Sequence, residues 1–118
     1  MSKGEQKIQK ALKELNVQFE QQYSFTDCRY VNPLPFDFLT RIGENRFLIE
    51  FNGEQHYGPV NFGGLANNNV YDTFDEVRKR DGIKKDYAFN NGILLLIIRY
   101  DETDRILELI KEFLNLKK

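Results

Sequence analysis

The chain has 118 residues, with 17 Lys and Arg against 18 Asp and Glu, a formal charge of -1, one His and one Cys. A chain of this length is expected to form one domain over residues 1–118, and the lone Cys28 cannot make an internal disulfide, so we expect a cytoplasmic protein. A single Cys and a single His cannot build a tetrahedral zinc site, so oxygen ligands must hold any metal. The longest aliphatic run is too short to span a bilayer, and the balanced charge argues against strong non-specific binding to nucleic acid.

The N-terminal half of the sequence predicts a helix followed by three strands. Apolar residues recur at three- and four-residue spacing over residues 4–15, which favours an amphipathic helix. A short strand over residues 17–25 and a polar loop over 26–35 that carries Cys28 are expected next. Residues 36–40 and 46–52 then form two β-rich runs, which a five-residue turn should join as an antiparallel hairpin.

The C-terminal half predicts a long loop, two helices and one strand. Gly, Pro and Asn interrupt residues 53–73, and a loop of this length is usually functional or disordered. A helix is expected over residues 73–90. The run 92–99 has no polar alternation, which is typical of a central strand with helices on both faces. Asp104 is positioned to cap the last helix. The predicted order is α-β-β-β-α-β-α, an α/β fold with a mixed sheet flanked by helices.

Two carboxylates interrupt apolar strands of the predicted hairpin. Asp37 lies between two Phe residues, and Glu50 lies between Ile49 and Phe51. Side chains on paired strands lie within about 5 to 8 Å of one another, so the two acids can share a divalent cation. The alternative for each is an ion pair with a nearby Arg or Lys. His56, the only imidazole, follows the second strand closely and is a candidate partner of the two acids.

A basic cluster lies on the predicted second helix and surrounds Asp81. It could form a solvated helix face, or it could contact a phosphate backbone. The loop before this helix contains aromatic residues separated by Gly and Asn, which either stack on bases or fold back on the sheet. The candidate DNA-contacting residues are Arg78, Lys79, Arg80, Lys84 and Lys85 on the helix, with Tyr57, Phe62 and Tyr71 in the loop.

Taken in order, Glu5, Asp37, Glu50, His56 and Asp81 form a set of acidic and histidine residues. This set resembles the Glu-Asp-x-His-Asp arrangement of the very-short-patch repair mismatch endonucleases and related phage homing endonucleases. The resemblance covers nearly the whole chain. It includes Gly-Glu-Gln-Lys at the first helix, Pro-Phe-Asp-Phe, the run from Leu48 to Tyr57, the Arg-Asp pair on the second helix and the Asn-Gly before the last strand.

This resemblance implies a restriction-endonuclease-like fold and Mg²⁺-dependent hydrolysis of phosphodiester bonds in double-stranded DNA, with Mn²⁺ as an alternative metal. It implies that Asp37 and Glu50 bind the metal, that His56 acts near the attacking water, and that Glu5 and Asp81 support the water and the histidine. The broader nuclease pattern places Lys two residues after the second carboxylate, where this chain has Asn52. His56 or a helix lysine, Lys84 or Lys85, would then supply the cation.

Other functions fit the same sequence. The departure at Asn52 is also compatible with a catalytically inactive, nuclease-derived DNA-binding module. Two further interpretations remain. The chain could be a junction-resolving nuclease on the same fold, or an α/β domain that docks an acidic partner through its basic helix. We expect no separate recognition module after the last helix, so target recognition would require the loop over residues 53–73 or a separate DNA-recognition chain. A double-strand cut would require a homodimer or two successive nicks.

Overall fold

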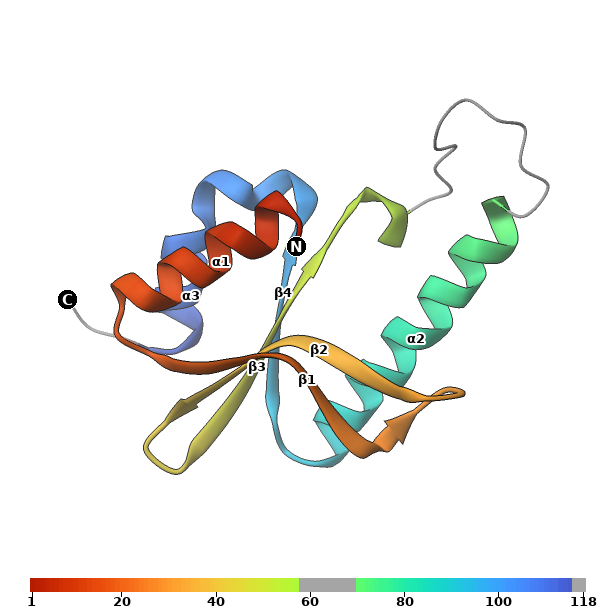
Figure 1. Ribbon diagram of the computed structural model, residues 1–118, viewed down its shortest axis with the longest axis horizontal. Coiled ribbons are helices and arrows are strands. Elements are labelled where there is room, and N and C mark those ends of the chain that lie inside the picture. The colour runs from red at the N-terminus through yellow and green to blue at the C-terminus, as the bar shows by residue number, and fades with distance from the viewer. Residues whose placement is uncertain (58–69, 116–118) are drawn as a thin grey trace.

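The computed structural model describes residues 1–57 and 70–115, in which helices flank a four-stranded mixed sheet (Figure 1). The sheet order is β1-β2-β3-β4, with β1, β2 and β3 antiparallel and β4 parallel to β3. Along the chain the elements are α1 (Lys3–Glu14), β1 (Gln18–Arg29), β2 (Pro33–Ile42), β3 (Asn45–Asn52), the 3-10 turn η1 (Glu54–His56), α2 (Val70–Asn90), β4 (Leu94–Arg99), the 3-10 segment η3 (Tyr100–Arg105) and α3 (Ile106–Phe113). The α/β class, the first helix and the hairpin are confirmed.

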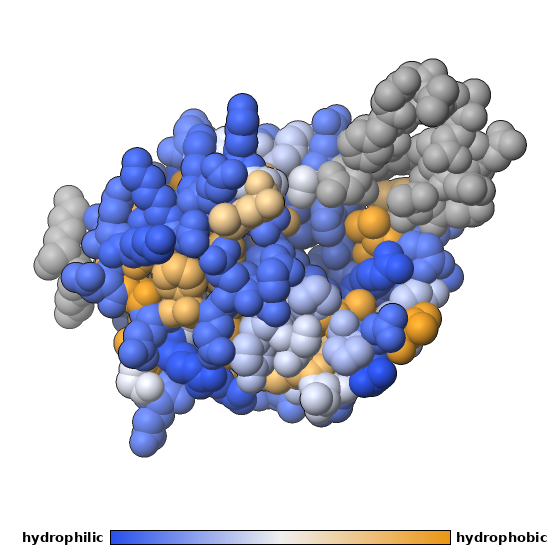
Figure 2. Space-filling model, viewed as in Figure 1, coloured by the Kyte–Doolittle hydropathy of each residue, from blue (hydrophilic) through white to orange (hydrophobic). Residues whose placement is uncertain are grey.

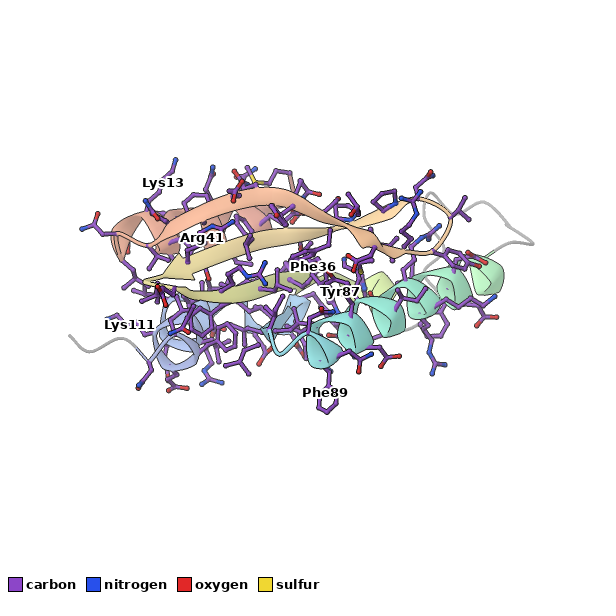
Figure 3. All side chains as sticks on the ribbon, turned by 90° about the horizontal axis from the view of Figure 1, so that it is seen from below. Lys13, Phe36, Arg41, Tyr87, Phe89 and Lys111 are labelled. Atoms are coloured by element: carbon purple, nitrogen blue, oxygen red, sulfur yellow. The ribbon has the colours of Figure 1, made fainter. Side chains whose placement is uncertain are left out.

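Two apolar cores lie on opposite faces of the sheet. Adjacent residues of a strand face opposite sides, and Phe38 packs with residues of α1 and α3 whereas Leu39 packs with α2. Figure 1 shows the same layering, with α1 and α3 on one side of the sheet and α2 on the other. In the side view of Figure 3, Phe36 and Tyr87 lie between the sheet and α2, and Phe89 points away from that helix.

The predicted polar loop over residues 26–35 is wrong, because most of it belongs to strands. β1 continues to Arg29, which pairs with Pro33, and Cys28 is buried within the strand. The strand continues because Asp27 finds a partner on α2 and the apolar side chains beside it pack against the same helix. Tyr87 Oη donates a hydrogen bond to Asp27 Oδ1 at 2.8 Å, and the Tyr87 ring packs 5.0 Å from that of Phe25.

The apolar C-terminal strand is at the edge of the described sheet rather than at its centre, where we had expected it. Leu95 packs on the α2 side and Ile98 on the α1 and α3 side, so helices do cover both faces. The apolar sequence therefore indicates the covered faces of β4, whereas its neighbours in the sheet depend on topology. Asp104 does not cap the last helix. It lies inside η3, and the N-cap position of α3 is Arg105.

The regular pairing of the sheet is interrupted at Gln22 and Asp37. Gln21 pairs with Phe38 and Tyr23 pairs with Phe36, but Gln22 is not paired with Asp37 and has a φ of 53°. Phe36 packs on the α2 side and Phe38 on the other, although residues two apart in a strand normally share a face. The strand thus switches faces at Asp37, and the β2–β3 pairing stops beside it.

No helix in the described part of the chain is both long and apolar enough to cross a membrane. The face shown in Figure 2 is largely hydrophilic, with apolar atoms visible in small separate patches. The middle of the expected loop over residues 53–73, including Phe62, lies outside the described residues, as does the side chain of Tyr71.

Candidate functional site

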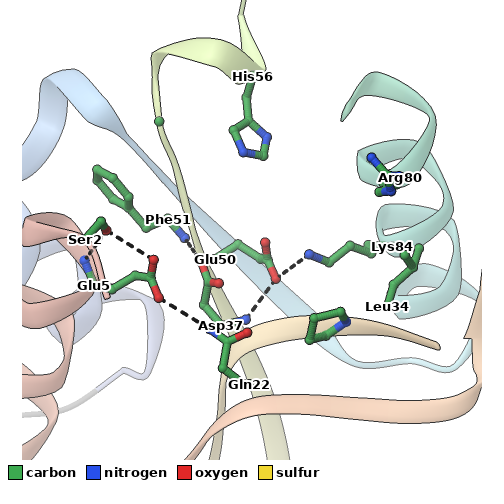
Figure 4. A pocket seen from close by; sticks show the side chains of 12 residues that line it. Ser2, Glu5, Gln22, Leu34, Asp37, Glu50, Phe51, His56, Arg80 and Lys84 are labelled. Carbon is green, nitrogen blue, oxygen red and sulfur yellow. Dashed lines mark hydrogen bonds and ion pairs between the residues drawn. The ribbon is translucent and has the colours of Figure 1, made fainter. Parts of the chain in front are cut away.

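Asp37 and Glu50 meet where the pairing of β2 and β3 stops. Glu50 Oε1 accepts a hydrogen bond from the Asp37 backbone N–H at 3.0 Å, and Asp37 Oδ2 accepts one from the Phe51 N–H at 2.7 Å. Each carboxylate therefore binds a backbone N–H of the neighbouring strand where regular pairing has ended. Both acids line one pocket of ≈ 420 Å³, shown in Figure 4.

The protonation of both acids is shifted by their surroundings. Burial raises the pKa of Glu50 to about 7, with the Asp37 carboxylate as the second cause, and the Lys84 ammonium acts in the opposite direction. Burial also raises the pKa of Asp37, an effect opposed by the hydrogen bond from Phe51 N–H and reinforced by Glu5. Burial and a neighbouring acid raise the pKa of each carboxyl group, so additional positive charge is favourable here.

Lys84 supplies part of that positive charge. Its Nζ lies 2.8 Å from Glu50 Oε1, and its side chain is only 13% exposed, against 7% for Glu50. Figure 4 shows Lys84 extending from α2 toward Glu50 across the pocket. Of the two helix lysines expected near the acids, Lys84 therefore reaches Glu50, whereas Lys85 is exposed on the helix surface.

Glu5 enters the pocket from the first turn of α1. Ser2 caps this helix, because its Oγ accepts from the Glu5 N–H and donates to Glu5 Oε1, both at 3.1 Å. Glu5 Oε2 accepts a hydrogen bond from Gln22 Nε2 at 3.4 Å. Gly4 brings the helix close to β3, because a Cβ at this position would overlap the ring of Phe51. Side-chain contacts thus fix Glu5 beside the paired acids.

His56 and Asp81 form a pair on the α2 side of the pocket. His56 belongs to η1, which follows β3, and its Nδ1 lies 2.8 Å from Asp81 Oδ2 on α2. Both side chains are largely buried. With Nδ1 protonated and donating to Asp81, the Nε2 atom can accept a proton. Figure 4 shows the imidazole pointing into the pocket.

All five acidic and histidine residues singled out in the sequence are brought together. Glu5, Asp37, Glu50 and His56 line the pocket, and Asp81 holds His56. Among the described residues, no three or more His, Cys, Asp or Glu side chains form a ready-made metal cluster. A hard cation here would therefore have two acids, Asp37 and Glu50, with water or a substrate oxygen completing its shell, which is a usual environment for Mg²⁺.

The predicted basic cluster is divided between the pocket and the outer surface of α2. Arg80 and Lys84 line the pocket. Arg78 is exposed and lies over the Phe74 ring, and Lys79 is exposed and lies 3.8 Å from Glu76. Lys85 is also exposed, whereas Tyr57 directly follows His56 and packs against Arg99.

Two polar residues that line the pocket, Ser2 and Gln22, were not anticipated. Ser2 could have been found, since Ser three residues before Glu is a helix-capping pattern. Gln22 carried no signal, because its left-handed backbone and its contact with Glu5 depend on the irregular pairing of β1 and β2.

Comparisons of the chain with protein-family models, with curated proteins and with solved structures gave no match.

Proposed function

We propose that the chain is a Mg²⁺-dependent DNA endonuclease with a restriction-endonuclease-like fold, related to the very-short-patch repair and phage homing endonucleases. The observation that carries this proposal is the pairing of Asp37 and Glu50. Their carboxylates come from neighbouring strands, each accepts a hydrogen bond from a backbone N–H of the other strand, and both face one pocket together with Glu5 and His56. Glu50 is buried and Asp37 is half-buried.

The residues fit a magnesium ion. Asp37 and Glu50 would hold it, since Mg²⁺ prefers oxygen ligands and commonly takes one or two carboxylates. When bound, the ion supplies positive charge against the phosphate and makes a water molecule more acidic. Lys84 neutralises only one of the two carboxylates, so the site retains negative charge that a divalent cation can balance.

The other side chains have distinct tasks in this proposal. Lys84 holds Glu50 in place and would supply the positive charge that the broader nuclease pattern takes from a lysine at the position of Asn52, which is buried here. His56 takes up or returns a proton at Nε2, while Asp81 fixes its ring through Nδ1. Arg80, at the mouth of the pocket, binds a phosphate oxygen of the backbone. Glu5 orients a water molecule beside Asp37.

A plasmid-nicking assay tests the proposal. Purified protein should convert supercoiled plasmid to nicked or linear DNA in Mg²⁺ or Mn²⁺ and should not do so in EDTA. Asp37→Asn preserves the acceptor for the Phe51 N–H but removes the charge, and it should lower the rate at least about 100-fold. Asp86→Asn, at an exposed acid of α2, is the matched control and should cut at the wild-type rate. Equal rates for the wild type and Asp37→Asn would refute the proposal.

The same assay separates the alternatives. A catalytically inactive DNA-binding module would retard DNA in gels without cutting it in any metal. A junction-resolving nuclease would cut four-way junctions at least tenfold faster than linear duplex of the same sequence. The ratio of nicked to linear product over time, measured at several protein concentrations, distinguishes a homodimer from a monomer that nicks twice.

A further inference from the structure

Beside the pocket lies an exposed stack of three side chains, Tyr57, Arg99 and Tyr100. The Arg99 guanidinium carbon is 4.2 Å from the centre of the Tyr57 ring and 5.9 Å from that of Tyr100. The two rings are 5.8 Å apart at an angle of 49°. Tyr57 is 40% exposed and Tyr100 38% exposed, and neither belongs to the two apolar cores.

The topology of the sheet puts this stack at the pocket. β3 and β4 are parallel and pair up to Asn52 and Arg99, so both chains leave the sheet at the same end. The chain after β3 carries His56 and then Tyr57, and the chain after β4 continues directly into Tyr100. Tyr57 of the stack therefore directly follows His56, which lines the pocket.

Electrostatics favour a flat ligand over an anion at this stack. Arg99 Nε and Nη2 lie 3.1 and 3.4 Å from the two carboxylate oxygens of Asp101, so the edge of the guanidinium is already paired. Glu102 accepts from the Arg99 backbone N–H at 2.9 Å and anchors the same turn. A phosphate would meet the adjacent Asp101 charge. The ring faces, in contrast, are suited to stacking with another aromatic ring.

We infer that the Tyr57–Arg99–Tyr100 stack binds an unpaired nucleobase of the DNA, next to the phosphate held in the pocket. This inference rests on the proposed function and specifies its substrate class, namely DNA with an unpaired nucleotide, in a bulge or a single-stranded tail, beside the cleavage position. Bases inside a duplex are already stacked on their neighbours, and unstacking them costs free energy that an unpaired base does not require.

Binding without cleavage tests this inference. Fluorescence anisotropy in EDTA compares a duplex that carries a single-nucleotide bulge with the same duplex fully paired. Wild-type protein should bind the bulged DNA roughly tenfold more tightly. Tyr57→Ala should lose this preference and Tyr57→Phe should keep it, because the aromatic ring is the binding element. Phe89→Ala, which removes an aromatic side chain that is 84% exposed on α2, is the matched control and should retain the preference.

A second readout needs only the wild-type protein. A 2-aminopurine at the bulge should lose fluorescence on binding if it stacks on an aromatic side chain. Equal affinity for the two DNAs, an unquenched probe or a preference retained in Tyr57→Ala would overturn the inference. If the protein nicks plasmid but shows no preference, only this inference fails, whereas absence of both DNA binding and nicking removes the proposed function as well.

Discussion

Replacing Glu50 with Gln should change how the stability of the protein depends on pH. The Gln side chain has nearly the same shape and keeps an oxygen that can accept from the Asp37 N–H. It removes the titrating group, so any pH dependence that Glu50 causes should be absent from the variant. Comparing the change between two pH values, rather than absolute stabilities, cancels effects of the substitution that are common to both.

The magnitude follows from the environment of Glu50. Burial, reinforced by Asp37 and opposed by Lys84, raises its pKa from 4.5 to about 7 on folding. The folded protein therefore binds more protons than the unfolded chain, and the associated stability is full below pH 4.5 and lost as the pH rises through about 7. Between pH 5 and pH 8, linkage gives a loss in unfolding free energy of about 2–3 kcal/mol from this group.

Urea denaturation followed by circular dichroism, in EDTA at pH 5 and pH 8, measures the effect. The loss of stability between these pH values should be about 2–3 kcal/mol larger in the wild type than in Glu50→Gln. Glu44→Gln, at an exposed acid in the β2–β3 turn, should behave as the wild type. The same pH dependence in the wild type and Glu50→Gln would refute the reasoning.

Three further predictions concern packing, the ion pair and metal binding. Gly4→Ala should lower the unfolding free energy by about 1–3 kcal/mol, because the new Cβ overlaps an aromatic ring of β3. Gly82→Ala is the control, because its Cβ faces open space and should not lower the stability. Equal losses of stability for the two variants in urea denaturation would contradict this prediction. Lys84→Met should destabilise the protein by about 1–3 kcal/mol at pH 8 and by less at pH 5, where Glu50 is protonated, with the exposed Lys85→Met as control. Mg²⁺ at about ten times its Kd should raise Tm by several degrees at pH 8 and by less at pH 5, and an unchanged Tm at pH 8 would count against a metal site.

The order of elements and the meeting of the acids could be predicted because they depend on local pattern. Asp37 and Glu50 interrupt apolar runs joined by a short turn, and hairpin pairing then brings them together. Residues 26–29 were missed because the contacts that hold them come from α2, such as the hydrogen bond of Tyr87 to Asp27, and such contacts are not visible in the sequence.

Details that depend on tertiary geometry could not be predicted. Whether Lys84 or Lys85 reaches the acids depends on the rotation of α2 about its axis. This rotation could not be predicted, because the apolar residues of the helix show little periodicity. The face switch at Asp37 coincides with the left-handed conformation of Gln22 on the neighbouring strand, for which a Gln gives no signal. The edge position of β4 depends on sheet order, whereas its aliphatic sequence indicates only that helices cover its faces.

The central claim is that Asp37 and Glu50 bind one divalent cation between them, and a crystal soaked in Mn²⁺ at pH 8 tests it most directly. Anomalous scattering should show one manganese ion within about 2.2 Å of an oxygen of each carboxylate. Ordered manganese elsewhere with none between these two acids, at a concentration that supports cleavage, would contradict the account.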